Sequence, residues 1–143
     1  MKKNVLVQII GTQQLPDGQE DRIEFVTPGT YYRRKGIYYV SYREAEHSGL
    51  EGVMTLLRVE SDNIVLQRIG RAELRQEYRK QALCPSVYVT PYGKLPMSIL
   101  TEAIDSDLTV QGGRISLKYD LFVDNEFVSH NGLMIIIKED LSQ

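Results

Sequence analysis

Two charged residues, Arg68 and Glu102, lie where the strand pattern around them predicts an inward-facing side chain. A charge taken out of water is costly unless it is paired and hydrogen-bonded. The plainer interpretation is therefore an internal ion pair, or a position at the end of a barrel where the charge still meets water. The alternative is a polar anchor, because an arginine can hold the carboxylate or phosphate of a ligand with two parallel hydrogen bonds.

Few residues could serve in nucleophilic catalysis, since the chain has two histidines, His47 and His130, and one cysteine, Cys84. Ser129 and His130 are adjacent, so on a strand their side chains point to opposite faces and cannot form a dyad. We expect His130 opposite Tyr119, partly buried and with its hydrogen bonds satisfied. Cys84 is expected to be a buried, small apolar residue. The sequence therefore predicts no enzymatic activity.

Metal and cofactor sites are not indicated either. A zinc site needs three or four ligands at characteristic spacing, whereas Glu44, Glu46, His47 and Glu51 form only a loose acidic cluster. We interpret that cluster as the solvated surface of a loop. The glycines are scattered, without a P-loop or a dinucleotide-binding fingerprint. We expect no metal and no cofactor.

Charge and hydropathy argue against nucleic-acid and membrane partners. The net charge is −2, and the cations Arg71, Arg75 and Arg79 alternate with Glu73 and Glu77, as in cross-strand salt bridges on a solvated face. No apolar run approaches the ~20 residues of a membrane-spanning helix. The first residues lack the cleavage site of a signal peptide, and the single cysteine is compatible with a reducing compartment. We expect a soluble, cytoplasmic protein.

The elements that would position these residues are short strands separated by turn residues, which is typical of a sandwich or a barrel. The chain of 143 residues fits a single domain over residues 1–143. The composition of 71–83 favours a helix, but Leu74, Gln76 and Tyr78 alternate with charged residues at period two, so we predict a strand there. The predicted strands cover 3–12, 21–34, 37–46, 51–61, 64–70, 73–80, 84–90, 97–111, 114–124 and 127–139.

The pair Gly112-Gly113 predicts a two-residue turn between a long predicted strand and a strand of strict alternation. This turn pairs Val110 with Ile115 and, further along, Ile104 with Leu121. The inward faces of the two strands would then hold Leu100, Glu102, Ile104, Ser106, Leu108 and Val110, and Ile115, Leu117, Tyr119, Leu121 and Val123.

A second inward face is predicted over residues 55–78. A tight turn at Asp62-Asn63, or one residue earlier, puts Thr55 and Arg68 on one face. A three-residue turn at 70–72 extends that face to the next strand. Its members would be Thr55, Leu57, Val59, Ile64, Leu66, Arg68, Leu74, Gln76 and Tyr78.

Several segments together resemble the YwiB-like family, a group of uncharacterised bacterial proteins with a domain of unknown function. The segments are YREAEHSGLEG (42–52), TLLRVESDNIVLQRIG (55–70), TPYGKLPM (90–97) and GGRISLKYDLFVDNE (112–126). The resemblance implies a single antiparallel meander that closes into a calycin-like or lipocalin-like β-barrel. It implies no activity.

An eight-stranded barrel can be filled by its own side chains or can hold one small ligand. We predict an all-β barrel that binds a small, anionic or amphipathic ligand without catalysis. The binding residues would be Arg68, Glu102, Tyr119, Tyr42 and Tyr78. The alternative is a structural or protein-interaction domain whose barrel is filled.

Overall fold

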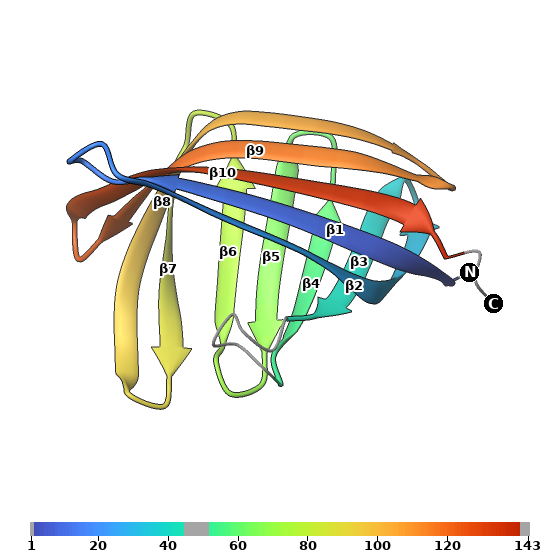
Figure 1. Ribbon diagram of the computed structural model, residues 1–143, viewed down its shortest axis with the longest axis horizontal. Coiled ribbons are helices and arrows are strands. Elements are labelled where there is room, and N and C mark those ends of the chain that lie inside the picture. The colour runs from blue at the N-terminus through green and yellow to red at the C-terminus, as the bar shows by residue number, and fades with distance from the viewer. Residues whose placement is uncertain (1, 45–51, 141–143) are drawn as a thin grey trace.

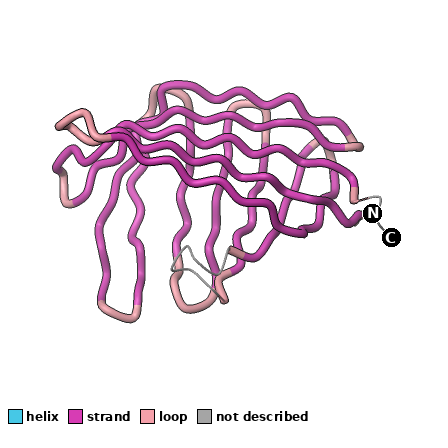
Figure 2. The backbone as a smooth tube through the Cα atoms, viewed as in Figure 1, coloured by secondary structure: helices cyan, strands magenta, loops and turns pink. Residues whose placement is uncertain are grey.

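The computed structural model describes residues 2–44 and 52–140 and contains strands, turns and loops but no helix within them (Figure 2). The strands are β1 Lys3–Gln14, β2 Glu20–Arg34, β3 Ile37–Arg43, β4 Met54–Val59, β5 Asn63–Ile69, β6 Leu74–Arg79, β7 Leu83–Thr90, β8 Gly93–Thr109, β9 Gly112–Val123 and β10 Glu126–Glu139. The all-β prediction is confirmed, and so is a strand rather than a helix at 74–79.

All the strands belong to one antiparallel sheet with the order β6-β5-β4-β3-β2-β1-β10-β9-β8-β7. Strands that follow one another in the sequence are therefore paired, except β6 and β7, and β1 also pairs with β10. The long strands β1, β2, β9 and β10 cross steeply over β3–β6, so the sheet curls into a nearly closed barrel (Figure 1). The predicted single meander is thus confirmed.

The barrel closes where β6 meets β7, although these two strands share no ladder in the part of the chain that the structure describes. Glu73 and Val89 exchange two backbone hydrogen bonds of 2.9 Å at one end. Further along, the fully buried Gln76 donates from Nε2 to the Cys84 carbonyl at 3.1 Å and accepts from Ser86 Oγ at 2.6 Å. We call these contacts the β6–β7 seam.

One half of the barrel is filled with side chains. The alternating strand pattern places β-branched and other apolar residues on its inner face, where they pack together. At this end Tyr31 stacks on Tyr38 with ring centroids 5.7 Å apart and donates from its hydroxyl to the Thr109 carbonyl. The fully buried members include Val5, Val40, Leu57, Ile64, Ile115, Leu117 and Ile135.

The turn between β8 and β9 lies at Val110-Gln111, two residues before the predicted position, and Ile104 pairs with Leu117 rather than with Leu121. The Gly112-Gly113 pair begins β9 instead. A Cβ on Gly113 would lie 2.0 Å from the Asp107 carbonyl oxygen, and a Cβ on Gly112 would lie 2.3 Å from the Ile137 carbonyl oxygen on β10. The glycines are thus needed for close backbone approach and not for the turn.

The prediction that Glu102 faces inward is wrong. Thr101 and Ala103 pair with consecutive residues of β9, so Glu102 is the extra residue of a β-bulge and its side chain is exposed. Because the bulge reverses the alternation, Ile99 and Thr101 are buried whereas Leu100 is exposed. The prediction for Ile104, Ser106 and Leu108, which follow the bulge, agrees with the structure.

A second bulge lies in β10 between Phe127 and Ser129. It shifts the register by one residue, so His130 lies opposite Asp120 and not opposite Tyr119. The predicted partial burial of His130 is therefore wrong, because its side chain is 60% exposed. By contrast, the predicted inward face over 55–78 is confirmed, with Thr55 opposite Arg68.

Candidate ligand-binding cavity

The other half of the barrel is hollow. A cavity of about 400 Å³ lies between the inner faces of the sheet, within the range of roughly 300–1,000 Å³ typical of small-molecule sites. Most of its wall is apolar and comes from strands on both sides of the β6–β7 seam. The apolar lining includes Ile9, Phe25, Leu74, Met97, Leu121 and Leu133.

Three polar residues at this side of the barrel form a cross-strand row. Tyr42 on β3 pairs with Thr55 on β4, which pairs with Arg68 on β5. Next to Tyr42 in β2 lies Gly29, where a Cβ would come within 2.5 Å of the Ser41 carbonyl oxygen and 3.4 Å of the Tyr42 Cβ. A glycine at this point lets the backbone of β2 approach β3 closely beside the polar row.

The charged pair in the cavity wall is Arg68 and Glu44, whereas the third charged lining residue, Asp21, is exposed. Arg68 Nε lies 3.7 Å from Glu44 Oε2, and the two side chains are 25% and 6% exposed. Thr55 donates its hydroxyl to the same Glu44 oxygen. Since 3.7 Å is too long for a hydrogen bond, Arg68 Nε is buried without a hydrogen-bond partner among the described residues.

Tyrosine hydroxyls surround this pair. Burial raises the pKa of Tyr42 far above its usual value, the Glu44 carboxylate raises it further, and Arg68 opposes the rise. The pKa of Tyr78 is raised too, by burial first and then by the neighbouring Tyr119. The Tyr78 and Tyr119 rings meet edge to face, with centroids 5.2 Å apart. The phenols of Tyr42 and Tyr78 therefore stay protonated and can donate hydrogen bonds at neutral pH.

The cavity brings together Arg68, Tyr42, Tyr78 and Tyr119, all proposed from the sequence as binding residues. Glu102 does not belong to this group, because it lies outside the barrel wall in a groove at the rim. The partner of Arg68 is Glu44 instead.

Sequence reasoning missed Glu44, since it was read as part of a solvated acidic loop. The only available signal was its position two residues after Tyr42, which on a strand means the same face. The other members of that loop, Glu46, His47 and Glu51, lie outside the described residues.

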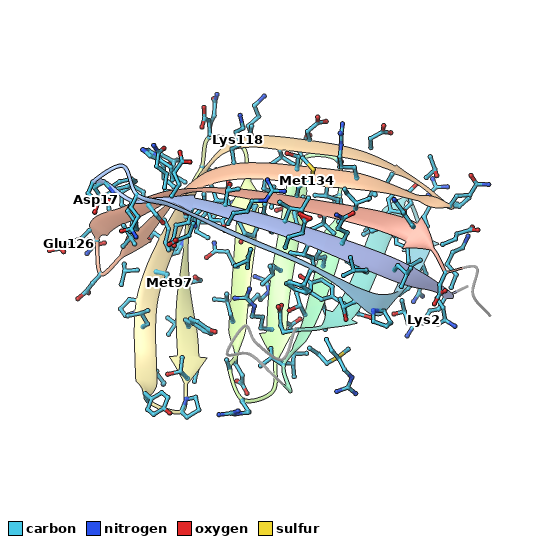
Figure 3. All side chains as sticks on the ribbon, in the orientation of Figure 1. Lys2, Asp17, Met97, Lys118, Glu126 and Met134 are labelled. Carbon is cyan, nitrogen blue, oxygen red and sulfur yellow. The ribbon has the colours of Figure 1, made fainter. Side chains whose placement is uncertain are left out.

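The rim groove has a volume of about 690 Å³ and adjoins the cavity, with which it shares lining residues such as Gln13, Tyr119 and Asn131. In this groove His130 Nδ1 lies 2.5 Å from Asp120 Oδ1. Asp17 lies at the tip of the β1–β2 hairpin and Glu126 at the tip of the β9–β10 hairpin, near the same end of the molecule (Figure 3).

Residues 2–44 and 52–140 contain no cluster of three or more His, Cys, Asp or Glu side chains placed to hold a metal ion. They also contain no helix long and apolar enough to cross a bilayer.

Comparison with known proteins bears on this barrel directly. The profile of the family described as "Domain of unknown function (DUF1934)" matches residues 7–135. The chain belongs to this family. It is similar to the uncharacterized beta-barrel protein YwiB of Bacillus subtilis (strain 168), with 36% identity over 110 residues that cover 77% of this chain and 76% of the relative.

A solved structure supports the fold of this DUF1934 protein. The crystal structure of the ywiB protein from Bacillus subtilis superposes with a TM-score of 0.87 and 27% sequence identity, over 97% of this chain and 93% of the other. The resemblance seen in the sequence is thus confirmed. The relative's description names a β-barrel and assigns it no activity.

Proposed function

We propose that this barrel binds a small amphipathic ligand in its cavity and does not catalyse a reaction. The observation that carries the proposal is Arg68 Nε, a buried donor without a hydrogen-bond partner that faces a mainly apolar cavity. A buried donor left unpaired costs free energy that a ligand acceptor would recover.

The neighbouring carboxylate decides what the polar end of the ligand must be. Glu44 balances the charge of Arg68 but leaves its Nε–H free. A ligand therefore needs a hydrogen-bond acceptor there, which a carboxylate or an uncharged carbonyl supplies. The apolar remainder of the ligand would pack against the walls formed by residues such as Phe25 and Leu133.

The absence of catalysis is part of the proposal and rests on the surroundings of the reactive side chains. Cys84 is buried, and its carbonyl serves the β6–β7 seam. His130 points into the rim groove and is held by Asp120. Neither lines the cavity. We further propose a cytoplasmic location, with neither nucleic acid nor a membrane as partner.

Native mass spectrometry of the protein isolated gently from its own host would test the proposal. We expect an added mass that disappears on denaturation and is lost in Arg68→Met. The matched control is Arg58→Met, since Arg58 lies on the neighbouring strand β4 but is exposed and paired with Glu60. A bare mass in repeated preparations, or retention of the added mass by Arg68→Met, would contradict the proposal.

A second candidate function is protein interaction, favoured by apolar side chains outside the barrel. On the outer face of β2, β1 and β10, Val26, Gln8 and Ile136 form one cross-strand row, with Leu6 and Ile10 on either side in β1. Leu6 and Val26 are exposed. Sedimentation analysis at increasing protein concentration tests this role. Association that is abolished in Val26→Asp would support it.

A further inference from the structure

A second polar group faces the cavity with an unmet hydrogen bond. Asn131 lies on β10 where the cavity meets the rim groove, and it lines both. Its Oδ1 atom is buried and has no hydrogen-bond partner among the described residues. The side-chain amide of Gln13, which pairs with Asn131 in the adjoining strand, donates to Ser129 Oγ at 3.2 Å and does not satisfy Asn131.

The two unpaired atoms have opposite requirements. Arg68 has only donors, so its partner must be an acceptor. Asn131 Oδ1 is an acceptor, so its partner must carry an O–H or an N–H. Arg68 is on β5 and Asn131 on β10, which lie on separate parts of the sheet with the cavity between them.

We propose that the ligand carries two polar groups joined by an apolar segment: an acceptor that meets Arg68 and a hydroxyl or amide donor that meets Asn131. Hydroxylated carboxylic acids have this chemistry, whereas simple fatty acids lack the donor. The inference deepens the proposed function and rests on it. A site built to pair a ligand hydroxyl discriminates against the analogue without it, because the buried oxygen is then left unpaired.

The test compares unbranched carboxylic acids of six to ten carbons, taken as chemical probes of about the cavity's size, with their ω-hydroxy counterparts. Calorimetry on the full chain measures both affinities. For at least one chain length we expect the hydroxy acid to bind about tenfold more tightly or better. Asn131→Leu should remove that advantage while leaving the affinity for the plain acid nearly unchanged.

Two further variants make the result specific. Gln14→Leu is the matched control, because Gln14 is an amide that borders the rim groove but not the cavity, and it should keep the advantage. Asn131→Asp keeps an acceptor oxygen and should also keep the advantage, which leaves the test valid if Asn131→Leu fails to fold.

The outcomes separate the two proposals. Equal affinities at every chain length, as expected if a water molecule satisfies Asn131, would overturn the two-group ligand while leaving the proposed function standing. An advantage that survives Asn131→Leu would overturn it as well. If neither set of acids binds the wild-type protein, or if binding does not depend on Arg68, the proposed function and this inference both fail.

Discussion

Arg68 and Glu44 depend on one another for stability, because removing one charge leaves the other in a largely buried place. We expect Arg68→Met to lower the free energy of unfolding by ~1–3 kcal/mol, less than for a fully buried pair, since Arg68 still reaches water. The double variant Arg68→Met with Glu44→Gln should recover part of that loss. Urea denaturation measures the free energy of unfolding of the two single variants and of the double variant. A loss in the double variant equal to the sum of the two single losses would argue against coupling.

Tyr42 and Tyr78 make the stability depend on alkaline pH. Their pKa values are raised in the folded protein, so above the unfolded value of 10.0 the unfolded chain loses protons that the folded one keeps. The contribution of these tyrosines to the free energy of unfolding is complete below pH 10 and is lost as the pH rises toward their pKa values in the folded protein.

For each raised tyrosine the free energy of unfolding should fall by about 1.4 kcal/mol per pH unit above pH 10. Tyr42→Phe and Tyr78→Phe should each make this fall less steep, as urea titrations between pH 9 and about 11 would show. Tyr92→Phe is the control, because Tyr92 is 97% exposed. An unchanged slope in both cavity variants would contradict the expectation.

At the scale of the elements, the β6–β7 seam depends on the side chain of Gln76, whereas the other neighbouring strands are joined by ladders of backbone hydrogen bonds. Gln76→Ala would remove the partners of the Cys84 carbonyl and of Ser86 Oγ. We expect a loss of ~1–3 kcal/mol and faster amide hydrogen exchange in β6 and β7. Gln67→Ala is the matched control on β5, because Gln67 points outward and is exposed. Equal losses in the two variants would show that the seam does not depend on Gln76.

The elements also show what the sequence could and could not predict. Strand positions follow from alternation and turn residues, so the face containing Thr55, Arg68 and Gln76 was predicted correctly. Bulges leave no comparable signal in the sequence. Each one inserts a single residue and so changes the facing of all the residues on one side of it. For that reason Glu102 was assigned to the inside and His130 was placed opposite the wrong partner.

The candidate site was only partly predictable for a different reason. Arg68 and the tyrosines were found because their strands alternate regularly. The partner of Arg68 depends on which residues the curvature of the sheet brings together, and Glu44 reaches it from two strands away. The unpaired state of Asn131 Oδ1 depends on distances that no sequence pattern encodes.

At the scale of the whole molecule, the barrel combines a filled half with a hollow half, and substitutions should distinguish them. Leu57→Ala in the filled half should cost ~2–5 kcal/mol, since it opens a void in a packed core. Leu133→Ala in the cavity wall should cost about 1 kcal/mol, because Leu133 is only partly buried and already borders open space. Thermal and urea unfolding would compare them, and equal costs would argue against a hollow half.

The strands are arranged as a ring in which β1 adjoins β10 through a continuous ladder, whereas the β6–β7 seam has one backbone bridge. The first and last strands are thus joined by a long ladder, whereas the strand pair with the least backbone pairing, β6 and β7, falls in the middle of the sequence. Circular permutation exploits ends that lie close together. A chain with β10 linked to β1 and opened between Lys80 and Gln81 would start at β7, finish at β6 and keep every ladder. The present order of the strands is therefore one of several circular permutations that are compatible with the same barrel.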